Sequence, residues 1–474
     1  MALSDSDFRA WLADESKQAV ILIEAGYYDG GAQTAYWSDV GYIDPTNPAG
    51  RNYLPVVTGD VVVDETLDRA VLSTVEIILY DQALLTWRFV GYGFTVWFGD
   101  RRWPRADFVK QATEKINNVL SPNRNTLQFQ FADLRAIYFD QLVNGNGRGL
   151  NAGLPFVFGR VFNMEPLRVN SNNYRFYTPA MFIGAEQARD NGVPVTITLT
   201  DFTADGKGDG LQVTITVASP PAGKLTLDLR AGHPELGGWT DSGIKRLLER
   251  MNSYIQLPIP LGPTVTSAPT ADLGYVFYQY GTVNEMLTQM CDSIGLNPRI
   301  NANGALDLVR IDTTGTATRL ITDSNLSQPL QLLGVEPPYK QLELGYRRNF
   351  ALQGTDTLAG SVSAANSFLY SREYTYAKST RTLTGYPFVR NQKRDTLLAT
   401  QVDAEAELLR RWTLRAVEHR SYSCEGDATF VADGIGDTIT IQSADYGFGA
   451  GIDVVVIGNK KNLSQQRCGL EIWV

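Results

Sequence analysis

The chain has 474 residues, of which 43% are hydrophobic and 20% charged, and these totals exclude both a single small core and wholesale disorder. Its 42 lysines and arginines face 51 aspartates and glutamates, which gives a formal net charge of −9. Because affinity for nucleic acid comes mainly from basic side chains that displace counterions, this balance disfavours a protein that binds DNA over its whole surface.

A short helix and an antiparallel β-domain are predicted in residues 1–150. Ser4 or Ser6 can cap the helix, whose apolar side would be formed by Phe8, Trp11 and Leu12. Period-two alternation follows, at 75–80 and most cleanly at 127–131, and places one face of each strand on a core. A loop rich in Asn and Gly, 144–153, would close the domain.

The stretch VWFGDRRWPRADF, residues 96–108, combines arginines, aromatic residues and a proline. The preceding alternation continues into it as a strand, and Gly99 and Asp100 begin a turn. Pro104 fixes its own φ angle and biases Trp103 toward extended geometry. The acidic residues of the stretch nearly balance the charge of its arginines, which argues against a nucleic-acid-binding site. We therefore predict a rigid hairpin corner that can also contact a neighbouring subunit, formed by Asp100, Trp103, Pro104 and Arg105.

A second, smaller β-unit is predicted over 151–235. The runs 193–199 and 211–217 alternate regularly, and each is predicted to be one strand. The segment 201–210 between them is turn material. Its three aspartates invite a calcium reading, but the twelfth position counted from Asp201 holds Gln212 rather than the glutamate of an EF-hand loop. Counted from Asp205, the twelfth position also lacks a glutamate. The segment with Asp201, Asp205 and Asp209 is therefore predicted to be a polar hairpin turn rather than a calcium loop.

A mixed α/β unit is predicted over 236–330. Apolar residues recur with helical spacing at 244–255 and again at 283–294. The proline-rich segment 256–270 between them favours an extended connection rather than a third helix. A hairpin should follow, with its turn at Asn303 and Gly304.

Strands resume in the last part, 331–474, beginning with 340–350. The low-complexity segment 354–367 predicts a long mobile loop, and the basic run 390–395 a solvated loop or a contact at the rim. One helix is expected at 403–418, with one face made of Ala404, Leu408, Leu409, Trp412 and Ala416. The chain then closes on strands at 437–442, 452–458 and 468–474, so that strand-rich ends flank a mixed middle.

Side chains that commonly carry catalysis or bind metals form no recognisable constellation. The two histidines are most simply a turn residue, His233, and a helix-end residue, His419. The cysteines lie far apart, and their odd number without CxxC spacing argues against a disulfide framework or a zinc site, so we expect all three to be reduced and buried: Cys291, Cys424 and Cys468. We predict no catalytic residue, no cofactor and no metal site.

The beginning of the sequence lacks the basic start and apolar run of a signal peptide. No apolar run approaches the ~20 residues that span a bilayer. We therefore expect the chain to fold in a cytoplasm, without insertion into a membrane.

Several segments, taken in order, resemble the hub proteins at the tips of bacteriophage tails. The first is NYLPVVTGDVVVDETLD followed by VWFGDRRWPRADFVK, a strand, a GD-x-x-WP turn and a return strand. LPFVFGRVFNMEPL and the helix-and-hairpin segment 281–312 are similar to the central region of those proteins. KQLELGYRRNF, DAEAELLRRW and GIGDTITIQ resemble their second tube-like domain.

The resemblance implies a mainly β protein with a smaller α+β part, in which two tail-tube-like antiparallel β-barrel domains flank inserted small domains. It would be divided into a tube-like barrel, a small β domain, a small α/β domain and a second tube-like domain with one helix: 1–150, 151–235, 236–330 and 331–474. No fused peptidase or lysozyme module is recognisable, so a structural protein rather than an enzyme is implied.

The resemblance also implies a place in the virion. A homotrimeric ring at the tail tip of a long-tailed phage (a siphophage), assembled in the cytoplasm of the bacterial host, would join the sixfold tail tube to a threefold central fibre or spike. Its partners would be the distal tail protein, the tail tube protein, the tape-measure protein and a separate fibre protein. DNA would pass through the lumen during ejection without specific binding, as suits an acidic conduit.

Two other functions stay open at this point. A carbohydrate-binding adhesin could use aromatic rings that stack on sugars, such as Trp37, Trp87, Trp97, Trp103 and Trp239. A cell-wall hydrolase could use a pair of carboxylates, although the sequence gives no distance between any two of them.

Overall fold

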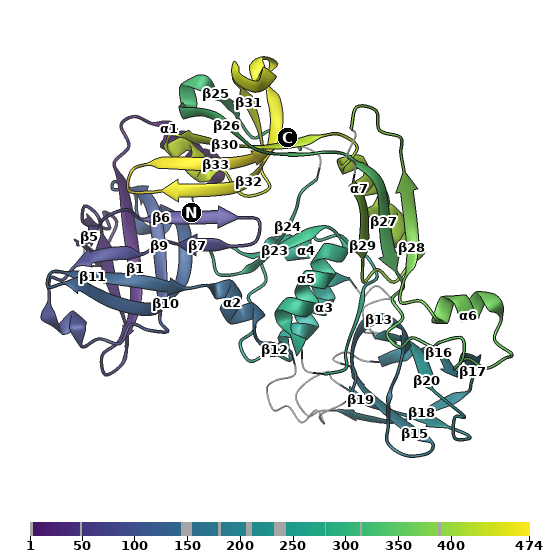
Figure 1. The fold of residues 1–474 in the computed structure, drawn as a ribbon. Helices are drawn as coiled ribbons and strands as arrows, with labels where there is room; N and C mark the ends of the chain where they lie inside the picture. Colours follow the sequence, from purple (N-terminus) through teal and green to yellow (C-terminus); the bar gives the residue numbers. More distant parts are fainter. Residues whose placement is uncertain are drawn as a thin grey trace.

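The computed structural model describes residues 3–47, 50–143, 154–178, 182–204, 211–231, 243–279, 281–312, 315–386 and 390–474. Several β-sheets dominate it, and most of its helices lie in the middle of the chain and near its end (Figure 1). The predicted class, a mainly β protein of several sheets with a smaller helical part, is confirmed. The predicted loop 144–153 lies outside the described residues.

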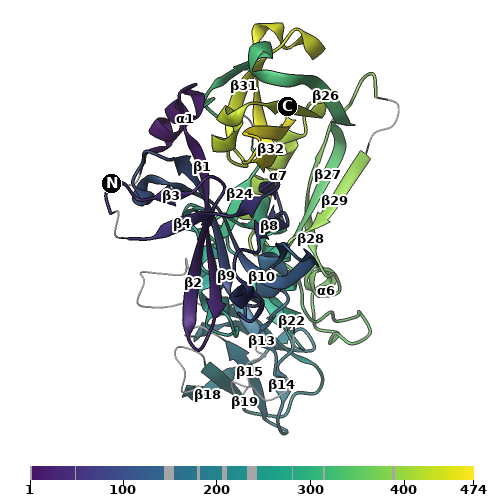
Figure 2. The same cartoon turned by 90° about the vertical axis from the view of Figure 1, so that its left-hand side faces the viewer.

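A nine-stranded sheet follows the first helix. The helix α1 (Asp5–Ala13) is capped by Ser4, whose hydroxyl accepts a hydrogen bond from the backbone N–H of Asp7 (3.2 Å), and it buries the three predicted apolar residues. The strands are, in spatial order, β3 (Tyr42–Ile43), β4 (Asn52–Pro55), β2 (Ala32–Ser38), β1 (Ala19–Tyr28), β9 (Gly93–Asp100), β10 (Val109–Asn123), β11 (Thr126–Ala132), β8 (Val75–Ile78) and β5 (Val57–Thr58). Figure 2 shows β1 to β4 on the near side. A short 3-10 turn, η1 (Gln82–Leu85), follows β8.

An eight-stranded sheet is built mainly from the last part of the chain. Its strands are β25 (Leu320–Thr322), β31 (Thr438–Gln442), β32 (Ile452–Asn462), β33 (Arg467–Trp473), β30 (His419–Gly426) and β26 (Leu326–Glu336), with β6 (Val62–Thr66) and β7 (Ala70–Leu72) added beside β32. The 3-10 turns of this region are η5 (Asp323–Asn325), η6 (Ala428–Ala432) and η7 (Asp445–Ala450).

The two large sheets share one hydrophobic core. Trp37 and Phe129 from the first sheet belong to the same buried cluster as Phe430 and Val456 from the last part of the chain. The strand β6 pairs antiparallel with β32, with Val63 opposite Lys461. The two ends of the sequence therefore form one packed unit (Figure 1). The four-part division of the chain stays a prediction.

The small β-unit is a further nine-stranded sheet. Its strands are β17 (Val193–Pro194), β16 (Phe182–Asp190), β20 (Leu225–Ala231), β13 (Phe156–Met164), β15 (Asn173–Thr178), β19 (Leu211–Val217) and β18 (Ile197–Ala204), with β14 (Leu167–Arg168) and β21 (Gly274–Phe277) at its side. The strand predicted at 211–217 is confirmed. The single strand predicted at 193–199 is wrong, because Pro194 pairs back onto β16 through a turn while Ile197 begins a strand beside β19.

The mixed unit contains α2 (Leu134–Phe139), α3 (Ile244–Asn252), α4 (Pro263–Thr266), α5 (Val283–Ser293), the hairpin β23 (Leu296–Ile300) and β24 (Leu306–Arg310), and the pair β12 (Leu142–Val143) and β22 (Gly281–Thr282). Both predicted helices and the hairpin are confirmed, and Gly304 has the positive φ of 74° that its turn requires. The segment 256–270 is not wholly extended. Pro263 starts α4, where its fixed φ suits the first position of a helix.

The remaining elements are β27 (Tyr339–Tyr346), β28 (Thr375–Thr380), β29 (Arg390–Asp395), α6 (Ala364–Tyr370) and α7 (Gln401–Leu414). The run 390–395 forms β29 and pairs parallel with β27, so the predicted loop is wrong. The segment 354–367 is not one long loop either, since Ser363 caps α6. The helix α7 ends four residues before the predicted end, and Leu409, predicted on its apolar face, is 65% exposed.

Candidate functional site

The four predicted corner residues lie together where β9 ends and the chain turns into β10 through η2 (Arg105–Asp107). Asp100 is fully buried. Its carboxylate accepts hydrogen bonds from Trp11 Nε1 (2.8 Å), from the backbone N–H of Gln18 (2.9 Å), and from the backbone and the guanidinium of Arg102 (2.9 Å and 2.7 Å). Burial raises the pKa of Asp100, but these hydrogen bonds outweigh it and hold that pKa well below its usual value. A buried carboxylate thus ties α1 to the corner.

Trp103 and Pro104 hold the turn itself. The Trp103 ring packs against the ring of Trp11, with 4.7 Å between their centroids, and its carbonyl accepts a hydrogen bond from the Tyr42 hydroxyl (2.8 Å). Pro104 has φ −63°, the value that its ring imposes, and its ψ of 150° makes the backbone extended there. The corner is therefore fixed on two sides, by α1 and by β3. Its contact with a neighbouring subunit stays a prediction.

Arg105 is held inside the molecule by neighbours from three strands. Its guanidinium lies 3.7 Å above the ring of Trp97. Its Nε donates to the hydroxyl of Tyr53 (2.9 Å), and its Nη2 lies 3.0 Å from the carboxylate of Glu24. The side chain is only 14% exposed. A guanidinium stacked and paired in this way is poorly placed to bind phosphates.

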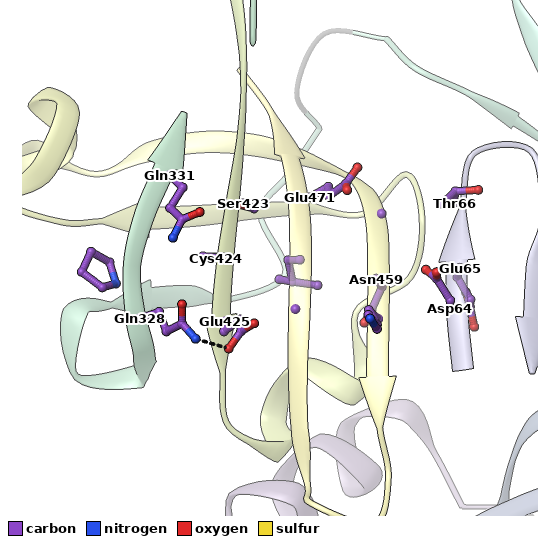
Figure 3. Close-up of a pocket in the computed structure, with 15 residues that line it drawn as sticks. Asp64, Glu65, Thr66, Gln328, Gln331, Ser423, Cys424, Glu425, Asn459 and Glu471 are labelled. Atoms are coloured by element: carbon purple, nitrogen blue, oxygen red, sulfur yellow. Dashed lines mark hydrogen bonds between the residues drawn. The ribbon is translucent and has the colours of Figure 1, made fainter. Parts of the chain in front are cut away.

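A polar hollow of about 330 Å³ lies on the C-terminal sheet, where five neighbouring strands contribute its walls (Figure 3). The register of β26, β30, β33, β32 and β6 arranges the side chains in two rows across the sheet. The first row is Gln328, Glu425, Gly469, Lys460 and Asp64, and the second is Gln331, Ser423, Glu471, Gly458 and Thr66. Sequence reasoning missed this face, because no local pattern tells which strands pair.

The two rows form an acidic face with a shallow floor. Glu425, Glu471 and Asp64 are exposed there, with Lys460 as the cation among them. Glu425 on β30 accepts a hydrogen bond from the amide of Gln328 on the edge strand β26 (2.7 Å), which fixes its carboxylate (Figure 3). Each row contains one glycine, Gly469 or Gly458, whose lack of a side chain leaves the hollow open. The face can repel anions, because three carboxylates on it face one lysine.

Directly behind this face lies a buried ion cluster. Glu65 is 3% exposed, and its carboxylate lies 3.0 Å from Lys461 Nζ and 3.5 Å from the guanidinium of Arg299. Burial raises the pKa of Glu65, but the two cations outweigh it and lower that pKa below its usual value. The cluster joins β6, β32 and β23, and therefore three separate parts of the chain.

The histidines and cysteines take structural places where they are described. His419 begins β30, but its ring still contacts the carbonyl of Leu414 at the end of α7, and its Nδ1 lies 2.7 Å from the carbonyl of Val474. All three cysteines are free and buried, as predicted, and burial raises the pKa of Cys424 and of Cys468 to about 12. His233, Asp205 and Asp209 lie outside the described residues, while Asp201 lies within β18.

The tryptophans proposed as sugar platforms mostly pack against protein. Trp37 is fully buried, and its Nε1 donates to the Tyr80 hydroxyl (3.3 Å). Trp87 stacks on Tyr27 with 3.9 Å between their centroids. Trp97 is half-buried beneath Arg105, and Trp239 lies outside the described residues. Within the described ranges, no helix has the length and apolarity needed to span a bilayer.

Comparison with solved structures finds phage tail and baseplate proteins, the class named by the sequence resemblance, each at low identity. A prophage tail protein from Listeria monocytogenes EGD-e is 8% identical, with a TM-score of 0.43, over 96% of this chain and 94% of that one. The 43 kDa tail protein of prophage MuSo2 from Shewanella oneidensis is 9% identical, with a TM-score of 0.40, over 96% and 98%. A tail protein from Neisseria meningitidis MC58 is 8% identical, with a TM-score of 0.38, over 96% and 97%. No protein family and no curated protein matches the sequence.

Proposed function

We propose that this chain is the structural hub of a phage tail tip, in which a homotrimeric ring joins the sixfold tail tube to a threefold central fibre or spike. The observation that carries the proposal is the sheet shared by the two ends of the chain, in which β6 pairs with β32. A subunit whose two β-regions are fused through one core can present both of them as neighbouring segments of a ring.

The acidic face supports the second part of the proposal, a conduit for the tape-measure protein and DNA. Rows containing Glu425, Glu471 and Asp64 cross five strands, with Lys460 as the only cation in them. A wall of negative charge keeps phosphates from adhering, because DNA binding depends on counterion release by cations. In the proposed ring this face lines the lumen.

The distal tail protein, the tail tube protein and a separate fibre protein complete the proposed assembly. The corner of Asp100, Trp103, Pro104 and Arg105 suits a contact between subunits, since its turn is fixed by internal hydrogen bonds before assembly. A rigid contact loses little conformational entropy when a neighbour binds.

Electron microscopy of the purified full-length protein tests the proposal. We expect threefold rings, and a trimer mass by light scattering. A map at side-chain resolution should place Glu425 and Glu471 toward the central channel. A protein that stays monomeric when mixed with the distal tail and tail tube proteins contradicts the hub, whereas a ring with these acids on its outer surface contradicts only the conduit wall.

A further inference from the structure

A groove of about 920 Å³ opens on the N-terminal sheet, on the face that points away from the shared core. Alternation along the strands explains its position. In β1, Ile23 belongs to the shared core while Glu24 faces the groove. In β9, Val96 belongs to the core while Trp97 faces the groove. The described residues that line it come from β1, β2, β4, β9, the corner and the segment after β3.

A preformed hydrogen-bond network forms the floor of the groove. Glu24 Oε1 accepts hydrogen bonds from the hydroxyl of Tyr53 (2.6 Å), from Arg105 Nη2 (3.0 Å) and from Arg51 Nη1 (3.1 Å). These partners come from β4, from the residue before it and from the corner. Because three donors hold one carboxylate oxygen, the polar groups of the floor are fixed before any ligand arrives.

Aromatic rings lie beside these polar groups. The guanidinium of Arg51 lies 5.1 Å from the centroid of the Tyr36 ring, and Tyr36 packs edge-on against Tyr53 with 5.3 Å between their centroids. Among the described residues, the buried indole N–H of Trp97 has no hydrogen-bond partner. Buried donors are almost always paired in proteins, so this unpaired donor is an unusual feature behind the groove wall.

The charges of the groove indicate the chemical class of the ligand. Arg51 and Arg105 face Glu24 and Asp44, so the charges balance, and both guanidiniums already have a carboxylate partner or an aromatic one. An anionic ligand would meet no free excess of positive charge, and an apolar ligand would desolvate these ions. A neutral ligand rich in hydroxyl groups suits both the ions and the rings.

We propose that this groove is a saccharide-binding site that takes a neutral oligosaccharide. Its volume falls in the range of small-molecule sites, ~300–1,000 Å³. Sugar hydroxyls can pair with the fixed carboxylate, the guanidiniums and the exposed amide of Asn52, while the apolar side of a sugar ring packs against Tyr36. The site does not depend on the trimeric ring.

Titration of the full-length protein with neutral hexasaccharides tests the proposal, with maltohexaose, chitohexaose and a galactose hexamer as probes. Saturation-transfer NMR detects binding, and tryptophan fluorescence gives the affinity. We expect at least one probe to bind. Arg51→Ala should weaken binding about tenfold, as for loss of one charged hydrogen bond, and Asn52→Ala about fivefold, as for loss of a neutral one. Both side chains are exposed, so circular dichroism should stay unchanged.

Arg124→Ala and Asn125→Ala are matched controls, because they remove the same exposed side chains at the β10–β11 turn, outside the groove. We expect both to bind as the parent protein does. If none of the three probes binds at a concentration of about 10 mM, any dissociation constant lies above the range of a specific site, and the proposal is overturned. Equal losses in groove and control variants also overturn it, as does binding of polyglutamate in place of every saccharide.

Discussion

Asp100→Ala should unfold the corner and release α1 from the first sheet. The substitution removes the acceptor of the Trp11 indole N–H and of the Gln18 backbone N–H, both held at less than 3 Å. A buried donor left without an acceptor costs about 1–3 kcal/mol, which applies to the Trp11 N–H. The Gln18 N–H is only partly buried, so water can replace its acceptor and it adds less. The ion pair with Arg102 adds little, because the Arg102 side chain is 51% exposed and water screens the pair.

A loss of this size is a large part of the stability of one domain, ~5–15 kcal/mol. Hydrogen exchange of the α1 and β9 amides measures the loss of stability at the corner itself. A local measurement is needed because a chain with several sheets need not unfold in one step. Arg102→Ala is the matched control and should leave the protection of these amides nearly unchanged. Equal protection in Asp100→Ala and the parent protein, or an equal loss in Arg102→Ala, refutes the reasoning.

The same carboxylate predicts a pH dependence. The pKa of Asp100 is lower in the folded protein than its ordinary value of about 3.9. Its contribution is therefore complete above that ordinary value and is lost as the pH falls toward the folded pKa. Protection of α1 should decline in acid in the parent protein, and the Asp100→Ala variant should lack this part of the decline.

Other substitutions probe the corner and the buried acids. Trp103→Ala should lower stability by about 3 kcal/mol or prevent trimer formation, as seen by thermal melting and light scattering, while Arg102→Ala should leave DNA affinity unchanged in a filter-binding assay. Glu65→Gln leaves two buried cations without their carboxylate and should cost about 3–5 kcal/mol in urea unfolding. Burial and a nearby acid raise the pKa of Glu114 to about 8. Stability should therefore fall as the pH rises from about 4.5 to 8, and Glu114→Gln should abolish that slope.

Features encoded by neighbouring residues could be predicted from the sequence. The cap at Ser4, the alternation at 127–131 and the Asn303–Gly304 turn all depend on interactions within a few residues. The corner at 96–108 was recognisable for the same reason, since Pro104 restricts its own backbone and that of Trp103.

Features set by distant contacts could not be predicted. Period-two alternation shows that a strand has a buried face, but it does not identify the partner strand, so the pairing of β6 with β32 left no local signal. The hydrogen bond from Trp11 to Asp100 spans 89 positions. The composition of segment 354–367 predicted no regular structure. Leu358 and Val362 nevertheless pack near Gly192, in the turn between β16 and β17, and that contact holds the chain leading into α6.

The pairing of β6 with β32 also governs when this protein can finish folding. Glu65 and Lys461 are 396 positions apart, so a ribosome makes one side of the shared sheet long before the other. Until β32 emerges, β6 is an open strand edge beside an uncovered apolar face, the kind of surface that chaperones bind and that aggregates. We expect chains truncated before residue 452 to be bound by chaperones or degraded in the cell. Only subunits whose synthesis is finished would then be available for assembly.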